Sequence, residues 1–285
     1  MRLLFINLLL LLLSVCASGQ TDTISIFINA GQHQLVDSAA IPAKSFNLTS
    51  EFKLDGQVFR FTQGQEVIFK ITNTDTIGHT IEIPAYGFST FIDSGKCVNT
   101  PITFNTKGVF QMYSKTDYPQ EKYLGLSSLI TVESNWDHSF YWNIKEYQSS
   151  FNTAIQNGDA IDFTTYTPDY FLINGRSNPD IATDTLAKIR GKVGDTITLH
   201  ILNSGNSVHS LHFHGYHFEV LASSRTPNVV GWIKDTYAVY GGERISLQIV
   251  PDKPGEYPVH DHNLVATTAN NYYPNGMFTT MIITE

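Results

Sequence analysis

The chain has 285 residues, of which 15% are charged and 12% aromatic, and its formal net charge is −8. An acidic surface repels nucleic acid and anionic lipid, so we expect neither as a partner. Aromatic and β-branched residues are plentiful, and such residues favour strands over helices. The composition therefore predicts an all-β protein, and the length suits two domains of ordinary size.

The N-terminus predicts a secretory signal peptide over residues 1–19. Arg2 precedes an apolar run of about ten residues, and small residues follow before Gln20. The run is shorter than the roughly 20 residues of a transmembrane helix, and no other stretch is long enough to span a membrane. Cys16 invites a lipoprotein interpretation, which the bulky Val15 disfavours. We therefore expect a secreted or periplasmic protein whose only remaining cysteine is Cys97.

The rest of the chain repeats itself. Residues 64–88 align without a gap with residues 194–218, so that His79 matches His209 and Phe88 matches Phe218. Residues 54–57, 108–115 and 124–133 match residues 173–176, 255–262 and 275–285 in the same order. Short alternating stretches between Gly, Asn, Asp and Pro turns predict strands. We predict two copies of one β-sandwich domain, residues 20–138 and 139–285, with a linker strand and a short helix in residues 140–159.

Two histidine motifs, HSLHFH (209–214) and HDH (260–262), predict a metal site in the second copy. Side chains alternate between the faces of a strand, so His212 and His214 share one face, as do His260 and His262. Imidazole suits copper, zinc, iron and nickel. The alternative is a set of four histidines satisfied only by hydrogen bonds or water.

His209 and Asp261 are predicted to face the core, with Met277 as a candidate neighbour. An imidazole, a carboxylate and a thioether form a poor ligand set because their softness differs. Two polar side chains in a core need each other as hydrogen-bond partners. This favours a buried His–Asp hydrogen bond over a remodelled metal site. His79, in the first copy, has no ligand-type residues in its motif and is interpreted as structural.

The segments HSLHFHGYHF, GEYPVHDHNL and NGM resemble the copper motifs of multicopper oxidases, and two such domains per chain resemble copper nitrite reductases and two-domain laccases. The resemblance implies two tandem cupredoxin-like Greek-key β-sandwich domains, a copper cofactor, and a homotrimer with metal between domain 1 of one subunit and domain 2 of the next. By position it assigns His212, His214, His260 and His262 to half of a trinuclear cluster. It assigns His209 and Met277 to a type 1 site.

The departures from that pattern change the expected chemistry. Asp261 stands at the type 1 cysteine position, and a blue copper site depends on a thiolate. In domain 1, Glu82 and Pro84 replace the HxH histidines, and Lys115 places an ammonium at a ligand position. Glu82 of a neighbouring subunit is a candidate extra ligand.

These features together predict a secreted, copper-binding, multicopper-oxidase-like protein. If it is an active enzyme, it is a non-blue copper oxidoreductase that takes electrons directly from a small-molecule reductant or from a metal ion. The alternative is a non-enzymatic copper-binding or structural cupredoxin that has lost redox catalysis.

Overall fold

The computed structural model describes residues 21–285, so the predicted signal peptide lies outside the described residues. The chain forms four β-sheets, which confirms the all-β prediction. The strands of the first half are β1 (Asp22–Gln34), β2 (Ala40–Asn47), β3 (Val58–Thr62), β4 (Gln65–Asn73), β5 (His79–Ile83), β6 (Phe88–Ile92), β7 (Cys97–Phe104), β8 (Gly108–Ser114) and β9 (Ser127–Glu133). Those of the second half are β10 (Ser139–Tyr147), β11 (Tyr170–Ile173), β12 (Arg190–Lys192), β13 (Ile197–Asn203), β14 (His209–Phe213), β15 (Phe218–Ser223), β16 (Ile233–Lys234), β17 (Thr236–Val239), β18 (Arg244–Ile249), β19 (Gly255–Asp261) and β20 (Phe278–Thr284).

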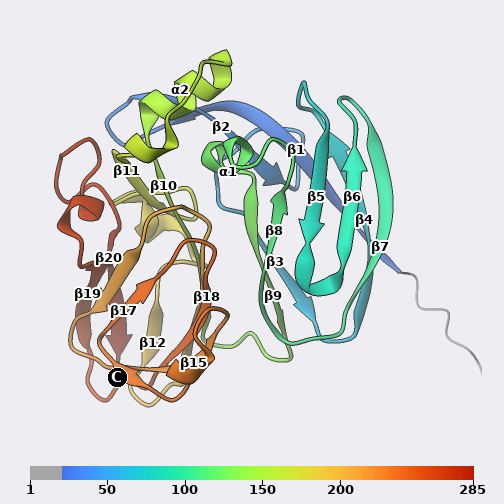
Figure 1. The fold of residues 1–285 in the computed structure, drawn as a ribbon. Helices are drawn as coiled ribbons and strands as arrows, with labels where there is room; N and C mark the ends of the chain where they lie inside the picture. Colours follow the sequence, from blue (N-terminus) through green and yellow to red (C-terminus); the bar gives the residue numbers. More distant parts are fainter. Residues whose placement is uncertain (1–20) are drawn as a thin grey trace, which may run out of the picture.

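Each half packs two sheets around its own apolar core, and the two halves lie side by side (Figure 1). The first half has the strand orders β2-β1-β4-β7 and β3-β9-β8-β5-β6. The second has β11-β10-β13-β18-β15-β16 and β12-β20-β19-β14-β17. Strand β4 shows why this architecture forms, because every second residue along it, Val67, Phe69 and Ile71, is buried.

The few helical segments are short. They are α1 (Gln120–Leu124), α2 (Ser149–Asn157), η1 (Pro84–Tyr86), η2 (Phe163–Thr165), η3 (Asp180–Thr183), η4 (Pro227–Val229) and η5 (Leu264–Thr267). Strand β10 and helix α2 are the linker strand and short helix predicted within residues 140–159. Within the described part of the chain, none of the helices has the length and apolar character needed to cross a membrane.

The strand registers correct the sequence alignment at one point. His79 on β5 pairs with Ile92 on β6, whereas His209 on β14 pairs with Val239 on β17. Strand β17 is therefore the counterpart of β6, and the segment that forms β15, η4 and β16 has no counterpart in the first half. The gapless match of Phe88 with Phe218 is wrong, because this insertion begins before Phe218.

The two halves contact each other through equivalent turns, residues 54–57 and 173–176. A Cβ atom on Gly56 (φ 53°) would lie 2.4 Å from the Cα atom of Asn174. A Cβ atom on Gly175 (φ 72°) would lie 1.6 Å from the carbonyl oxygen of Leu54. Only glycine fits both the left-handed backbone and the close approach at these positions.

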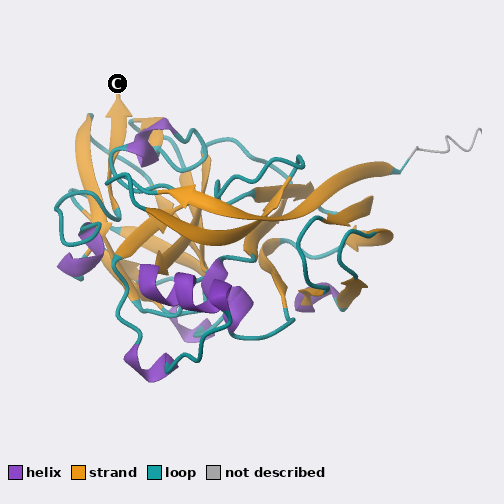
Figure 2. Cartoon of the chain, turned by 90° about the horizontal axis from the view of Figure 1, so that it is seen from above, coloured by secondary structure: helices purple, strands orange, loops and turns teal. Residues whose placement is uncertain are grey.

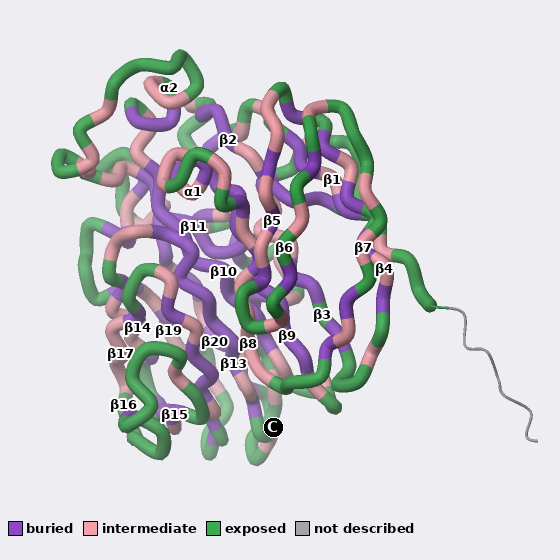
Figure 3. Tube along the Cα trace, turned by 45° about the vertical axis from the view of Figure 1, so that its right-hand side comes forward, coloured by how far each residue is buried: buried purple, intermediate pink, exposed green. Residues whose placement is uncertain are grey.

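Further apolar contacts join the halves. Tyr141 on β10 lies in one buried cluster with Val58 and Leu129 of the first half. The hairpin of β1 and β2 extends across to the second half, as Figure 2 shows from above. Buried segments accordingly continue from one sandwich to the other (Figure 3).

Candidate metal centre and the buried histidines

A row of four side chains crosses the β12-β20-β19-β14-β17 sheet of domain 2. Thr236 pairs with His212, His212 with His260, and His260 with Phe278, on strands β17, β14, β19 and β20. Residues directly opposite each other in a sheet project from the same face. The row therefore brings one histidine from each motif together at the centre of the sheet, on the face that points away from the core.

The structure gathers the four predicted imidazoles around His212. The ring centre of His212 lies 4.7 Å from that of His214, 5.8 Å from that of His260 and 5.5 Å from that of His262. The Nε2 atoms of His214 and His260 are 3.0 Å apart. His214 and His262 are exposed, and the other two are half-buried. The group is therefore open to solvent in this chain.

Hydrogen bonds decide which ring nitrogens are available as ligands. His260 Nδ1 lies 2.8 Å from the carbonyl oxygen of Asp261, which can only accept, so Nδ1 carries the proton and Nε2 keeps its lone pair. His214 Nε2 then donates to His260 Nε2. Burial lowers the pKa of His214, and the neighbouring imidazoles lower it further. His214 therefore favours the neutral imidazole, the form that binds metal.

His209 lies on the other face of β14, inside the core, and contacts two carboxylates. Its Nδ1 atom lies 2.6 Å from Asp261 Oδ2, and its Nε2 atom lies 3.0 Å from Glu146 Oε2. All three residues are at most 1% exposed. The predicted His–Asp hydrogen bond is confirmed, but the second carboxylate was not predicted. Met277 is also buried, and its carbonyl oxygen accepts from the Asp261 N–H at 3.3 Å.

The two carboxylates keep His209 charged. Burial alone would lower the pKa of His209, but the hydrogen bonds to Asp261 and Glu146 raise it to about 9. Burial alone would raise the pKa of Glu146, but His209 lowers it to about 2. Both ring nitrogens of His209 are therefore protonated at neutral pH, and neither is free to bind a metal.

The carboxylate that contacts the histidine Nε2 atom comes from different positions in the two domains, from Glu146 in the second and from Asp75 in the first. Asp75, which matches Gly205 in the repeat, binds His79 Nε2 through Oδ2 at 2.8 Å. A Cβ atom on Gly205 would lie 1.8 Å from Glu146 Oε2. Glu146 thus supplies from the linker strand β10 the carboxylate that Asp75 supplies locally. The glycine at position 205 is the one sequence signal that could have indicated this exchange.

In the first domain, a lysine side chain lies among the carboxylates beside the equivalent histidine, His79. His79 Nδ1 lies 3.0 Å from Ser114 Oγ, the counterpart of Asp261. Lys44 Nζ lies 2.7 Å from Asp75 Oδ2 and 2.8 Å from Glu121 Oε1. His79 is buried and hydrogen-bonded at both ring nitrogens, and the prediction that it lacks ligand partners is wrong. Asp75 and Glu121 lie close enough to share a cation with it, and the Lys44 ammonium binds both carboxylates.

The candidate extra ligand Glu82 is held within its own domain. Glu82 Oε2 accepts from the Tyr113 hydroxyl at 2.9 Å, and Glu82 Oε1 lies 2.9 Å from Lys115 Nζ. Glu82 and Tyr113 are the counterparts of His212 and His260 in the strand register. The first domain therefore replaces the imidazole pair with a carboxylate and a phenol, and Lys115 neutralises the carboxylate.

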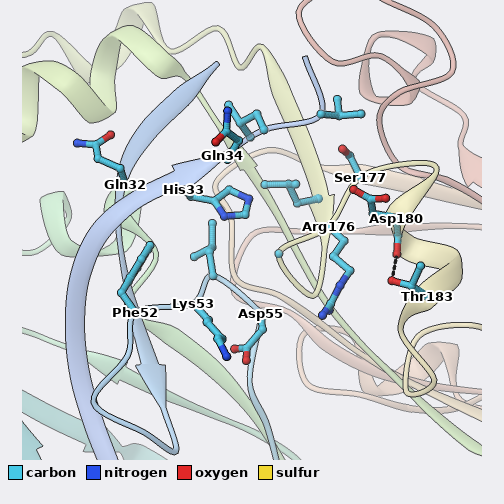
Figure 4. Close-up of a pocket in the computed structure, with 15 residues that line it drawn as sticks. Gln32, His33, Gln34, Phe52, Lys53, Asp55, Arg176, Ser177, Asp180 and Thr183 are labelled. Atoms are coloured by element: carbon cyan, nitrogen blue, oxygen red, sulfur yellow. Dashed lines mark hydrogen bonds between the residues drawn. The ribbon is translucent and has the colours of Figure 1, made fainter. Parts of the chain in front are cut away.

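A separate hollow of about 410 Å³ lies between the two halves, away from the histidine motifs. Figure 4 shows Lys53 and Arg176 approaching it from opposite sides, with Asp55 and His33 between them. Burial lowers the pKa of His33, and the charge of Arg176 lowers it further. No motif in the sequence indicated this hollow, because its walls come from segments that are far apart along the chain.

Comparisons with known proteins agree with this architecture. The family model described as "Multicopper oxidase" matches residues 152–285. A blue copper oxidase from Nitrosomonas europaea has a TM-score of 0.76 at 21% identity, over 93% of this chain and 86% of that one. The multicopper oxidase mgLAC has a TM-score of 0.76 at 19% identity, over 93% and 86%. A copper nitrite reductase from Nitrosomonas europaea has a TM-score of 0.72 at 18% identity, over 93% and 95%.

No curated protein matches the sequence. The structural likeness confirms the fold as two tandem cupredoxin-like domains. It also confirms the resemblance to multicopper oxidases and copper nitrite reductases, which are copper proteins.

Proposed function

We propose that this chain is a secreted or periplasmic copper-binding protein that holds copper through His212, His214, His260 and His262. The observation that carries the proposal is the convergence of these four imidazoles on one solvent-facing surface of domain 2. Imidazole is a ligand that copper prefers. Four clustered imidazoles without a metal repel one another whenever they are protonated, and a bound cation removes that cost.

The spacing of one pair of donor atoms suits a copper ion. A copper ion that replaced the proton between His214 Nε2 and His260 Nε2, which lie 3.0 Å apart, could bind both through metal–nitrogen bonds of about 2 Å. The ring centre of His212 lies 4.7 Å from that of His214 and 5.5 Å from that of His262, so His212 and His262 would have to turn toward the ion to complete a set of four nitrogens. Bound copper would supply one-electron redox chemistry, and the chain would supply its ligands and the open approach to it.

The type 1 position does not fit copper. Hydrogen bonds to carboxylates occupy both nitrogens of His209, and Asp261 offers oxygen where a thiolate is required. Electrons therefore cannot enter through that centre. An oxidoreductase reaction would need a small reductant or a metal ion to approach the exposed face beside His214 and His262 directly.

A non-enzymatic role is the second candidate. It is favoured by the cationic side chains that lie between buried carboxylates in both domains, His209 in domain 2 and Lys44 in domain 1. Such a protein would carry or buffer copper, or form an assembly, without turnover.

A homotrimer that covers the histidine face is part of the proposal. Leu264 and Val265 follow His262 after one intervening residue, and both are more than half exposed, as are Tyr272 and Tyr273. Exposed apolar side chains of this kind mark interaction surfaces when they lie together. Light scattering on the purified chain measures the assembly. The domain boundary between residues 138 and 139 also stays a prediction.

Metal analysis of purified protein loaded with Cu(II) tests the copper site. We expect bound copper without the intense thiolate-to-copper absorption band near ~600 nm that marks blue sites. His212→Ala with His260→Ala should remove the copper. His33→Ala with His138→Ala, which changes two histidines outside the cluster, should not. Unchanged copper content in the first variant would disprove the site.

Assays with phenols, Cu(I) and nitrite decide between the two candidate functions. Turnover that is lost in His212→Ala with His260→Ala supports an oxidoreductase. Copper binding without turnover of any of them supports the non-enzymatic role.

A further inference from the structure

We infer that Thr236 is a positioning residue, which prepares His212 for metal binding by fixing which of its ring nitrogens carries the proton. This inference deepens the proposed function and rests on it. Thr236 lies outside the sequence motifs, because it is on β17, after the insertion within the second domain.

The sheet register places Thr236 beside His212. The two residues form a cross-strand pair between β17 and β14, at one end of the row that continues to His260 and Phe278. His212 Nδ1 lies 2.8 Å from Thr236 Oγ1. A side chain held by a partner directly across a ladder has little freedom to rotate away. The hydroxyl therefore holds the orientation of the imidazole, and its oxygen can accept the Nδ1 proton.

A neutral imidazole carries one proton, and the hydrogen bond at one nitrogen decides the state of the other. When His212 Nδ1 donates to Thr236 Oγ1, Nε2 keeps its lone pair. The metal ligand is then the nitrogen farther from β17, on the side toward the partner imidazole of His260. Metal-binding histidines usually have such a partner on their second nitrogen, and its loss typically weakens metal binding about 10–100-fold.

His260 also carries its proton on Nδ1, but a main-chain group rather than a side chain accepts it. Its Nδ1 atom donates to the Asp261 main-chain carbonyl at 2.8 Å, and its ring stacks on Phe278 with ring centres 5.9 Å apart. A main-chain carbonyl is present whatever side chain occupies position 261. His212 depends instead on the identity of one side chain, which makes Thr236 the position where a single substitution can release a ligand.

The test compares Thr236→Val, which keeps the side-chain shape without the hydroxyl, with Thr236→Ser, which restores the hydroxyl. Nitrogen-15 NMR of histidine-labelled, metal-free protein reports the tautomer of His212. Competition against a chelator of known affinity measures Cu(II) binding. We expect Thr236→Val to lose the Nδ1–H tautomer of His212 and to bind Cu(II) about 10–100-fold more weakly. Thr236→Ser should behave as the original chain does.

Thr198→Val is the matched control, a half-buried strand threonine of the same domain whose hydroxyl makes no hydrogen bond within residues 21–285. The inference is overturned if Thr236→Val keeps both the tautomer and the affinity, or if Thr236→Ser loses them equally. If the original chain binds no Cu(II), the proposed function fails. The metal-free NMR measurement then still decides whether Thr236 sets the tautomer of His212.

Discussion

Glu146 Oε2 lies 3.0 Å from His209 Nε2, in the space that a side chain at position 205 would occupy. Glu146 Oε1 also accepts the main-chain N–H groups of Asn206 and Ser207, at 2.6 and 2.9 Å. One carboxylate therefore closes the turn before β14 and neutralises the histidine at its start. In the first domain the carboxylate of Asp75 makes both kinds of contact, because it lies on the turn itself: it lies 2.8 Å from His79 Nε2 and accepts the Thr76 N–H at 2.7 Å.

Glu146→Gln should destabilise the protein without changing the four-histidine surface. The substitution keeps the shape but removes the charge that pairs with buried His209. Breaking a buried ion pair typically costs about 3–5 kcal/mol. Urea denaturation followed by fluorescence measures the loss. Glu51→Gln, at a largely exposed ion pair with Lys53, is the control, and an equal effect of the two substitutions would contradict the role of Glu146.

Moving the carboxylate back to the turn should restore stability. Glu146→Ala leaves space beside His209, and Gly205→Asp then supplies a carboxylate as Asp75 does in domain 1. We expect the double variant to be more stable than Glu146→Ala alone. Gly205→Asp alone should be strongly destabilising, because its side chain would collide with Glu146. Additive losses in a double-mutant cycle would show that the two positions do not share one site.

The His209 network should give stability a defined pH dependence. The pKa of His209 is raised from 6.5 to about 9, so its contribution is full below pH 6.5 and is lost as the pH rises toward 9. The pKa of Glu146 is lowered from 4.5 to about 2, so its contribution is full above pH 4.5 and is lost as the pH falls toward 2.

The original chain should be more stable than Glu146→Gln, and this excess in the free energy of unfolding should be greatest between pH 4.5 and 6.5. Urea midpoints of both proteins from pH 3 to 10 measure it. An excess that grows from pH 7 to pH 9 would mean that His209 is neutral in the folded chain.

Gly175→Ala should weaken the contact between the two domains. The added Cβ atom would lie 1.6 Å from the Leu54 carbonyl oxygen, and the residue has φ 72°. Gly64→Ala separates the two causes, because Gly64 has φ 83° but nothing within 4 Å of its Cβ position. We expect Gly64→Ala to cost roughly 1 kcal/mol and Gly175→Ala clearly more. Thermal unfolding of both variants checks the order, and equal losses would mean that the turn contact carries little energy.

The sequence predicted features that repeat locally and missed those that depend on distant segments. Period-two patterns and the internal repeat gave the two β-sandwiches, and strand parity gave the grouping of His212, His214, His260 and His262. The alignment failed at Phe218, because the inserted strand β15 starts with a buried phenylalanine, which looks the same as a continued match. Glu146 and Thr236 were missed because each reaches its histidine from a strand outside the motif.

Strand β10 has a consequence for how the second domain can be divided. It lies between β11 and β13 in the six-stranded sheet, and it carries Glu146. The family match begins only at residue 152, after this strand. A fragment of residues 152–285 would keep every histidine of the copper motifs but would expose two strand edges and leave His209 without its second carboxylate. The segment that the family model matches is therefore smaller than the segment needed to complete the six-stranded sheet. Strand β10, which joins the two domains, belongs structurally to the second.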